Sequence, residues 1–373
     1  MKKIQDVENL KGKKIILRST LNVPLKDGKI INDFRLRKAM KTIDYLRKSD
    51  AKVILIGHIG RDKSLSLFPV YEYFKNLFPV SFAEEVLGDK TKSKVESMND
   101  GDVILLENLR QNEEETSNDD NFARELASLG DIYVNDDFAV SHGEHASVVG
   151  LPKYLPSFTG FLFQEEINEL SDALNPQSPS LCILGGAKFK TKEPLIEKFI
   201  DIYDNVFVSG ALAHDFFKAN GFNIGKSLIS DTGVDIKELS LNEKIMTPSD
   251  VTVENKDGVF IKKPNEVLDG DSIVDAGPET AEYLSKLLND FKFILWNGPL
   301  GEYERGFNKQ TETVAKAIAE SSAETLMGGG DTIAATENLG LEDKFSFIST
   351  GGGAMLKFLL DGTLVGIEAL KRE

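Results

Sequence analysis

Short apolar runs alternate with helix-like stretches along the whole of the 373-residue chain. In the first half we expect strands at 14–18, 52–58, 102–108 and 132–137, and helices at 35–48, 68–77 and 121–129. In the second half we expect strands at 180–184, 205–209, 272–275, 291–296, 324–327 and 345–349, and helices at 192–199, 211–219, 279–288, 308–321 and 354–360. This alternation predicts an α/β fold with mostly parallel, doubly wound sheets. The near-continuous apolar strands are typical of sheets that are covered on both faces.

The middle of the chain predicts a connection between two domains. A chain of this length favours two domains. A helix expected over 161–176 is preceded by Pro152–Pro156 and followed by the linker-like Gln177-Ser178-Pro179. A surface helix of one large domain is the alternative, but a fresh series of strands begins directly after the linker. We therefore expect domains at 1–160 and 177–360, joined by the helix.

Charge and cysteine content exclude several classes of protein. The net charge of −16 disfavours nucleic acid and anionic membranes as partners. The single cysteine, Cys182, excludes a disulfide framework, and its apolar surroundings favour a buried small side chain over a reactive thiol. No signal peptide and no apolar run of membrane-spanning length is evident, so a cytoplasmic location is expected. The acidic stretch 113–120 is expected to be a solvated loop.

Basic side chains gather where the strands of the first half end. Arg18 and His58 lie at strand ends, Arg61 and Arg110 lie just beyond strands, and Arg35 opens a helix. Ligands of doubly wound sheets bind at the carboxyl edge of the strands. These five residues therefore predict a site for a small anionic ligand.

Glycines occupy the corresponding positions in the second half. A glycine cluster between a strand and a helix lets backbone amides approach a phosphate, which the helix dipole also favours. One cluster could be a simple turn, but several together indicate phosphate binding. Lys188 and Lys192 accompany the first cluster, and Asp331 in another is a candidate Mg²⁺ ligand. The glycines are Gly185-Gly186, Gly210, Gly277, Gly298, Gly328-Gly329-Gly330 and Gly351-Gly352-Gly353.

Motifs of other nucleotide-binding and metal-binding folds are incomplete in this sequence. Gly225-Lys226-Ser227 resembles the end of a P-loop, but Asn220 stands where that motif requires glycine. No dinucleotide-binding glycine motif follows a strand. His142 and His145 lack the surroundings of a zinc site, so we expect structural roles for both. The residues alone therefore indicate phosphoryl transfer between a nucleotide and an anionic acceptor that they do not identify.

An ordered set of motifs across nearly the whole chain resembles the phosphoglycerate kinase family. In the first half they are Arg18–Pro24, Asp33-Phe34-Arg35, Gly57–Arg61, Glu107–Arg110, Val134-Asn135-Asp136 with His142 and His145, and Gly160-Phe161-Leu162. In the second half they are Gly185–Lys188, Asp275–Thr280, Trp296–Pro299, Gly328–Thr332 and Ser349–Ala354.

The resemblance implies two Rossmann-like domains and reversible phosphoryl transfer between Mg-ATP or Mg-ADP and 3-phosphoglycerate or 1,3-bisphosphoglycerate, with domain closure. It further implies a monomer whose tail, 361–373, packs on the first domain. The acid substrate would be held by Thr20, Asn22, Arg35, His58, Arg61 and Arg110. The nucleotide would be held by Gly185, Gly186, Lys188, Lys192, Gly210, Asn297, Pro299, Glu304, Gly330, Asp331 and Thr332, with Glu304 near the ribose and Asp331 serving Mg²⁺. Arg35, Lys192, Gly352 and Gly353 would act on the transferring phosphoryl group.

Three positions depart from the family pattern, and two of them, 20 and 143, belong to the family's acid-substrate site. The family usually has Asp at Thr20, Arg at Gly143 and a small apolar residue at Asp137. Because losing a carboxylate at position 20 offsets the loss of a cation at position 143, we hypothesise that these two departures are coupled. The departures leave two alternatives to an active phosphoglycerate kinase: a nucleotide-binding regulatory homologue, and a kinase for a related acid.

Overall fold

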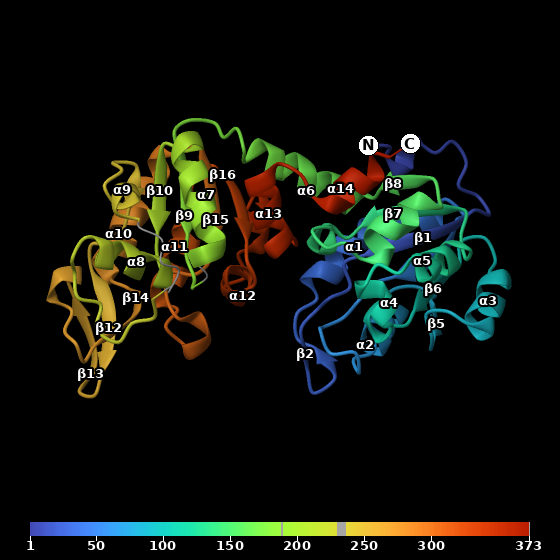
Figure 1. Ribbon diagram of the computed structural model, residues 1–373, viewed down its shortest axis with the longest axis horizontal. Helices are drawn as coiled ribbons and strands as arrows, with labels where there is room; N and C mark the ends of the chain where they lie inside the picture. The colour runs from blue at the N-terminus through green and yellow to red at the C-terminus, as the bar shows by residue number, and fades with distance from the viewer. Residues whose placement is uncertain (188, 230–235, 373) are drawn as a thin grey trace. The chain divides into compact units, whose positions relative to one another are not determined.

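The computed structural model describes residues 1–187, 189–229 and 236–372, and the chain forms two compact units. The first unit contains Met1–Asn168 and Asp361–Glu373, and the second contains Glu169–Leu360. The boundary falls inside helix α6 (Phe161–Asp172), drawn in green in Figure 1, which ends earlier than the sequence predicted. The side chain of Lys188, one of the expected phosphate ligands, lies outside the described residues.

The first unit is built on a sheet of six parallel strands in the order β5-β6-β4-β1-β7-β8. The central strand β1 pairs with β4 and β7, so that Arg18 lies beside Ile56 and Ser19 beside Asp136. The strands are β1 (Lys14–Ser19), β4 (Lys52–Ile56), β5 (Ser81–Ala83), β6 (Val103–Leu106), β7 (Ile132–Asp136) and β8 (Ser157–Thr159). This register brings the polar residues at the ends of β1 and β7 together.

Helices and one short hairpin complete the first unit. The helices are α1 (Phe34–Lys48), α2 (Phe68–Lys75), α3 (Asp89–Glu96), α4 (Glu113–Thr116), α5 (Asp120–Ala127) and α14 (Val365–Leu370), and the hairpin is β2 (Leu25–Lys26) with β3 (Lys29–Ile30). Helix α14 packs closely within this unit, where the Gly366 amide donates to the Ser141 carbonyl oxygen at 2.9 Å. A Cβ at Gly366 would lie 2.8 Å from the Ser141 Cβ, so the contact requires glycine.

The second unit repeats this architecture with a six-stranded parallel sheet in the order β11-β10-β9-β15-β16-β17. Its strands are β9 (Ser180–Leu184), β10 (Asn205–Val208), β11 (Ile245–Met246), β15 (Phe293–Asn297), β16 (Glu324–Gly328) and β17 (Phe347–Ile348). Its helices are α7 (Phe189–Ile202), α8 (Ala211–Ala219), α9 (Lys237–Ser240), α10 (Pro278–Leu287), α11 (Lys309–Glu320), α12 (Gly330–Asn338) and α13 (Gly353–Asp361). Every residue of β9 and β15 is buried, including Cys182. The predicted α/β class with parallel sheets is confirmed.

One predicted strand belongs to a different sheet. Strand β14 (Ser272–Ala276) joins β12 (Val251–Asn255) and β13 (Gly258–Lys262) in an antiparallel sheet, so its expected place among the parallel strands was wrong. Strands β12 and β13 are connected by a two-residue turn at Lys256-Asp257, followed by Gly258 with φ of +134°. The sequence analysis did not predict this hairpin, whose strand β12 pairs with β14 outside the parallel sheet.

The acidic stretch that we expected to be a solvated loop is partly helical and partly buried. Glu113–Thr116 forms α4, whose acidic first turn suits the positive end of the helix dipole. Glu115 is 1% exposed and accepts hydrogen bonds from the Ser147 amide at 2.9 Å and the Ser147 hydroxyl at 2.6 Å. The loop prediction was wrong because a run of charges does not reveal that one of them has hydrogen-bond partners inside the fold.

Asp136, at the end of β7, gives a prediction on stability. Burial raises the pKa of this carboxyl to about 7, and its Oδ1 accepts from the Phe163 amide at 3.1 Å. The folded chain therefore holds a proton that the unfolded chain releases near the ordinary pKa of 3.8. The stability gained from this proton is complete below that ordinary value and is lost as the pH rises through about 7.

We expect Asp136→Asn to flatten the pH dependence of the unfolding free energy between about pH 4 and 8, measured by denaturant titration. The exposed Asp120→Asn provides a control, because the pKa of Asp120 is lowered instead. A wild-type slope in Asp136→Asn would show that this carboxyl is already ionised throughout that range.

Candidate substrate sites

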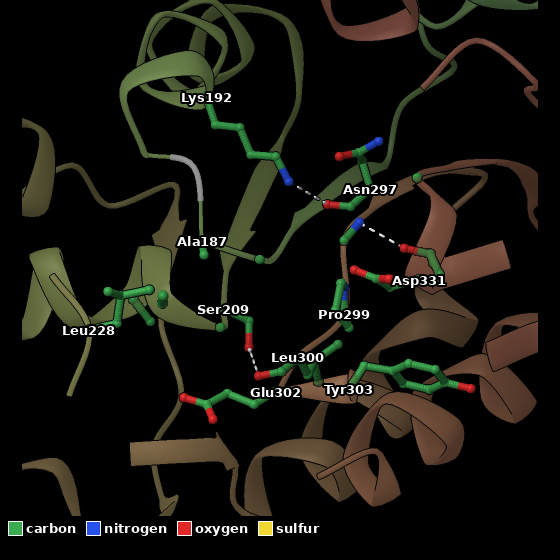
Figure 2. A pocket seen from close by; sticks show the side chains of 18 of the residues that line it. Ala187, Lys192, Ser209, Leu228, Asn297, Pro299, Leu300, Glu302, Tyr303 and Asp331 are labelled. Atoms are coloured by element: carbon green, nitrogen blue, oxygen red, sulfur yellow. Dashed lines mark hydrogen bonds between the residues drawn. The ribbon is translucent and has the colours of Figure 1, made fainter. Parts of the chain in front are cut away.

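A cavity of about 990 Å³ opens in the second unit near the carboxyl ends of β9, β15 and β16. Figure 2 shows Lys192 entering it from α7, Asn297 at the end of β15, Pro299 just after that strand, and Asp331 coming from α12. The structure brings together most of the residues that the sequence predicted for a nucleotide. Those that line the cavity are Gly186, Lys192, Gly210, Asn297, Pro299, Glu304, Gly330, Asp331, Thr332, Gly352 and Gly353.

The floor of this cavity depends on backbone segments that approach too closely for side chains. A Cβ at Gly185 would lie 2.0 Å from the Pro299 carbonyl oxygen. A Cβ at Gly298, where φ is +102°, would lie 2.4 Å from the Gly185 carbonyl oxygen. Gly185 does not line the cavity itself but supports the residues that do. The Gly298 amide in turn donates to the Thr332 hydroxyl at 2.9 Å, which ties β15 to α12.

The side chain of Lys192 contacts the backbone segments that form the floor of the cavity. Its side chain is 7% exposed, and its Nζ donates to the carbonyl oxygens of Gly185 at 2.5 Å and Asn297 at 3.3 Å. Figure 2 shows the second of these contacts. Two of the contacts of this amine are thus with backbone carbonyl oxygens of the cavity floor.

The close approach at Gly298 leads to a second prediction. Because an alanine Cβ would collide with the backbone of Gly185, we expect Gly298→Ala to weaken ATP or ADP binding at least about tenfold, measured by calorimetry. Gly340→Ala is the matched control, since Gly340 also has positive φ, +66°, but a Cβ there meets nothing within 4 Å. Equal losses in both variants would assign the effect to backbone strain rather than to the cavity floor.

The sequence did not reveal the apolar wall of the cavity. His214 and Phe217 of α8, Leu228 and Leu356 also line it. The Nδ1 atom of His214 lies 2.7 Å from the Leu228 carbonyl oxygen, and burial lowers the pKa of His214, so that the ring is neutral. These residues follow the ordinary pattern of a core helix, and only the fold shows that they face a cavity.

Asp331 is the residue that best fits a magnesium ion. It is exposed at the start of α12, and the described residues contain no group of three or more metal-binding side chains. Mg²⁺ in nucleotide sites is usually held by one or two carboxylates together with phosphate oxygens and water. A single carboxylate that lines a cavity predicted to bind phosphate fits this requirement.

In the first unit, backbone contacts hold two of the predicted cations. The Asn22 carbonyl oxygen accepts from Arg35 Nη1 at 2.7 Å, and the Gly60 carbonyl oxygen accepts from Arg110 Nη1 at 2.5 Å. The Asn22 side chain links the two segments, because its Oδ1 accepts from the Gly60 amide at 2.8 Å. Arg61 is exposed beside this group. The structure thus brings Asn22, Arg35, Arg61 and Arg110 together.

A buried network lies behind these residues. Arg18 is 0% exposed and forms an ion pair with Asp137, with 2.6 Å between Nη1 and Oδ2. Its Nη2 lies 3.0 Å from His58 Nδ1, and its Nε donates to the Ser147 hydroxyl at 3.0 Å. Thr20 is also buried, and its hydroxyl forms no hydrogen bond among the described residues.

Electrostatic effects in this unit favour an anion. Burial, followed by Arg18, Arg110, His145 and Arg35, lowers the pKa of His58 well below its ordinary value. Burial also lowers the pKa values of Arg35 and Arg110. Cations that are partly withdrawn from water gain by binding a negative charge.

The segment 142–145 contributes to the same surroundings. Burial and then Arg18 lower the pKa of His145 to about 4, so that its ring is neutral at physiological pH. A Cβ at Gly143 would lie 2.9 Å from His145 Nε2. The structural roles expected for His142 and His145 remain predictions.

Comparison with known proteins gives one consistent result. A family model described as phosphoglycerate kinase matches residues 4–362. The chain is 40% identical over 394 residues to a phosphoglycerate kinase of Clostridium kluyveri, covering 100% of this chain and 99% of the relative. It is 42% identical over 390 residues to one of Clostridium botulinum, covering 99% and 98%.

Solved structures agree with the sequence relatives. A phosphoglycerate kinase from Pyrococcus horikoshii aligns with a TM-score of 0.89 at 32% identity, covering 100% of this chain and 98% of the other. One from Coxiella burnetii aligns with a TM-score of 0.83 at 35% identity, covering 99% and 98%.

Proposed function

The chain belongs to the phosphoglycerate kinase family, and on that premise we propose how its residues divide the work. The enzyme is a phosphotransferase with a carboxyl group as acceptor, and it serves glycolysis. Its substrates are ATP or ADP and 3-phosphoglycerate or 1,3-bisphosphoglycerate. No observation favours the alternatives of a regulatory homologue or a kinase for a related acid.

The nucleotide is assigned to the cavity of the second unit. This proposal is supported above all by the cavity of about 990 Å³, which is lined by several glycines and has the Lys192 amine on its floor. Glycine turns at the starts of α12 and α13 offer backbone amides to phosphate oxygens. Glu304 is proposed to lie near the ribose, and the apolar wall near His214 suits an uncharged base.

The acid substrate is assigned to the first unit. Arg35, Arg61 and Arg110 supply cations for the carboxylate and the phosphate, and Asn22 and His58 supply hydrogen bonds. Thr20 lies beneath them at the end of β1. This half collects basic side chains on a chain whose net charge is −16, which supports selective attraction of an anion to one place.

The proposed mechanism requires only that the two substrates be aligned and that negative charge on the transferring phosphoryl group be neutralised. The substrate carboxylate is already a nucleophile, so no general base is required, and a neutral His58 is consistent with this. Lys192 would exchange its carbonyl partners for oxygens of the transferring phosphoryl group, assisted by the amides of Gly352 and Gly353. Arg35 would neutralise charge from the acid side.

A magnesium ion would be held by Asp331 together with the nucleotide phosphates. When bound, it neutralises charge on the phosphate oxygens. We further propose a monomeric, cytoplasmic enzyme that does not bind nucleic acid or membranes. Within the described residues, no helix is long and apolar enough to cross a membrane.

A coupled spectrophotometric assay with ATP, Mg²⁺ and 3-phosphoglycerate tests the function. We expect turnover that requires all three and that is abolished by chelating the metal. ATP binding without turnover would support the regulatory homologue. Turnover with another phosphorylated hydroxy acid, but not with 3-phosphoglycerate, would support a kinase for a related acid.

A further inference from the structure

The Arg18 guanidinium forms its hydrogen bonds with residues inside the protein. Its guanidinium donates through Nη1 to Asp137 and to the Ser19 carbonyl oxygen, through Nε to Ser147, and through Nη2 toward His58. All these partners are buried. A fully buried cation with four protein contacts is therefore poorly suited to bind substrate directly, although it belongs to the basic cluster that the sequence predicted.

The contact between Arg18 and His58 determines the state of the His58 ring. A guanidinium has no acceptor, so an Nη2–Nδ1 hydrogen bond at 3.0 Å requires a lone pair on His58 Nδ1. The single proton of a neutral ring must then lie on Nε2. Protonating Nδ1 would place two donors face to face, so this contact opposes the charged form of His58.

Arg18 keeps this position because Asp137 anchors it. The carboxylate pairs with Nη1 at 2.6 Å and is 1% exposed, so the pair is shielded from water. On the other side of the guanidinium, Ser147 accepts from Nε and donates to Glu115 at 2.6 Å. Two carboxylates, one direct and one through a serine, thus fix the plane of the guanidinium.

We propose that Asp137 is a positioning residue of the acid-substrate site, which acts through Arg18 to hold His58 as the neutral tautomer with its proton on Nε2. His58 then offers the acid substrate one directed hydrogen-bond donor and no additional charge. This inference rests on the proposed function, because it takes His58 as a ligand of the acid substrate.

The number of positive charges near His58 explains why the buried network around Arg18 needs a carboxylate at position 137. After burial, the charges of Arg18, Arg110, His145 and Arg35 lower the pKa of His58. Without Asp137, a buried and unpaired Arg18 would repel the other cations and would be free to turn toward any acceptor. Burial raises the pKa of Asp137, and Arg18, Arg35 and the nearby Thr20 hydroxyl oppose that rise. Within the described residues, neither the Thr20 hydroxyl nor Asp137 Oδ1 forms a hydrogen bond.

Nitrogen NMR of the histidine rings in the full-length enzyme tests the proposal directly. In the wild type we expect the Nε2–H tautomer of His58 to persist unchanged from about pH 5.5 to 8. In Asp137→Asn we expect a mixture of tautomers or a titration within that range. We also expect at least a tenfold increase in KM for 3-phosphoglycerate, with unchanged ATP affinity.

Two further variants keep the test decisive. Arg18→Met/Asp137→Leu replaces the ion pair by apolar side chains of similar volume, a change that buried pairs often tolerate, and it should free His58 even if Asp137→Asn does not fold. Asp271→Asn is the matched control, because Asp271 is also a buried carboxylate, paired with Lys262 at 2.6 Å in the second unit. It should lower stability without changing the His58 signal.

The outcomes separate this inference from the proposed function. An unchanged His58 tautomer in the folded variants would overturn the positioning role of Asp137. A wild-type His58 signal that does not respond to added 3-phosphoglycerate would instead remove His58 from the acid site. A changed tautomer with an unchanged KM would also overturn the proposal, since the positioning would have no effect on the substrate.

Discussion

Lys192→Ala is expected to lower kcat by about 10²- to 10³-fold while ATP affinity changes little, because we propose that the Lys192 ammonium stabilises charge that develops only during transfer. In the structure its Nζ lies over the carbonyl oxygens of Gly185 and Asn297, on the cavity floor. These neutral partners can be exchanged for phosphoryl oxygens at little electrostatic cost. Steady-state kinetics with calorimetric measurement of ATP binding would separate the two effects.

Lys198→Ala is the control for a purely structural effect. Lys198 lies on the same helix, and its Nζ also bridges two backbone carbonyl oxygens, those of Leu359 at 2.8 Å and Leu360 at 2.9 Å. If bridging carbonyl oxygens were the main task of Lys192, both variants should lose stability and activity to a similar extent. Wild-type kcat in Lys192→Ala would remove this residue from the mechanism.

The sequence predicted the features that depend on local pattern. Buried parallel strands such as β9 and β15 appear as continuous apolar runs, and their ends could be read as ligand sites because parallel strands expose the same edge. The glycines next to these ends were recognisable as a group. The structure adds the reason for two of them, since Gly185 and Gly298 stand where two backbones nearly touch.

Features that depend on distant partners could not be predicted. Glu115 lies in an acidic run and gave no sign that it accepts hydrogen bonds from Ser147, 32 residues further along the chain. Arg18 appeared to be a ligand cation, but its ion pair with Asp137, 119 residues away, turns it into a supporting residue. The Arg18–Asp137 pair is set by the register of β1 and β7, which composition and periodicity do not reveal.

The same register changes our hypothesis about the departures from the family pattern. We expected the loss of Asp at position 20 to offset the loss of Arg at position 143. However, Ser19 of β1 is the partner of Asp136 of β7, so Thr20 and Asp137 follow at the same level of neighbouring strands. A carboxylate is therefore still present beside position 20, and we now expect that the missing arginine is not offset in this way.

We therefore expect the strong coupling to join positions 20 and 137. Thr20→Asp alone places a second carboxylate next to Asp137 and should raise KM for 3-phosphoglycerate by about 10- to 100-fold. Thr20→Asp/Asp137→Ala should return KM to within a few-fold of the wild-type value. Its single carboxylate would lie next to the Ser19 carbonyl oxygen, which already accepts from Arg18 Nη1 at 3.2 Å.

A double-mutant cycle on KM distinguishes the two pairings. Thr20→Asp and Gly143→Arg should combine almost additively, because an arginine at 143 must first displace the His145 ring, 2.9 Å from the new Cβ. Additive effects at positions 20 and 137 would contradict our expectation, since two carboxylates competing for one arginine cannot act independently. Strong coupling there would mean that Arg18 requires one carboxylate partner and that either strand can supply it.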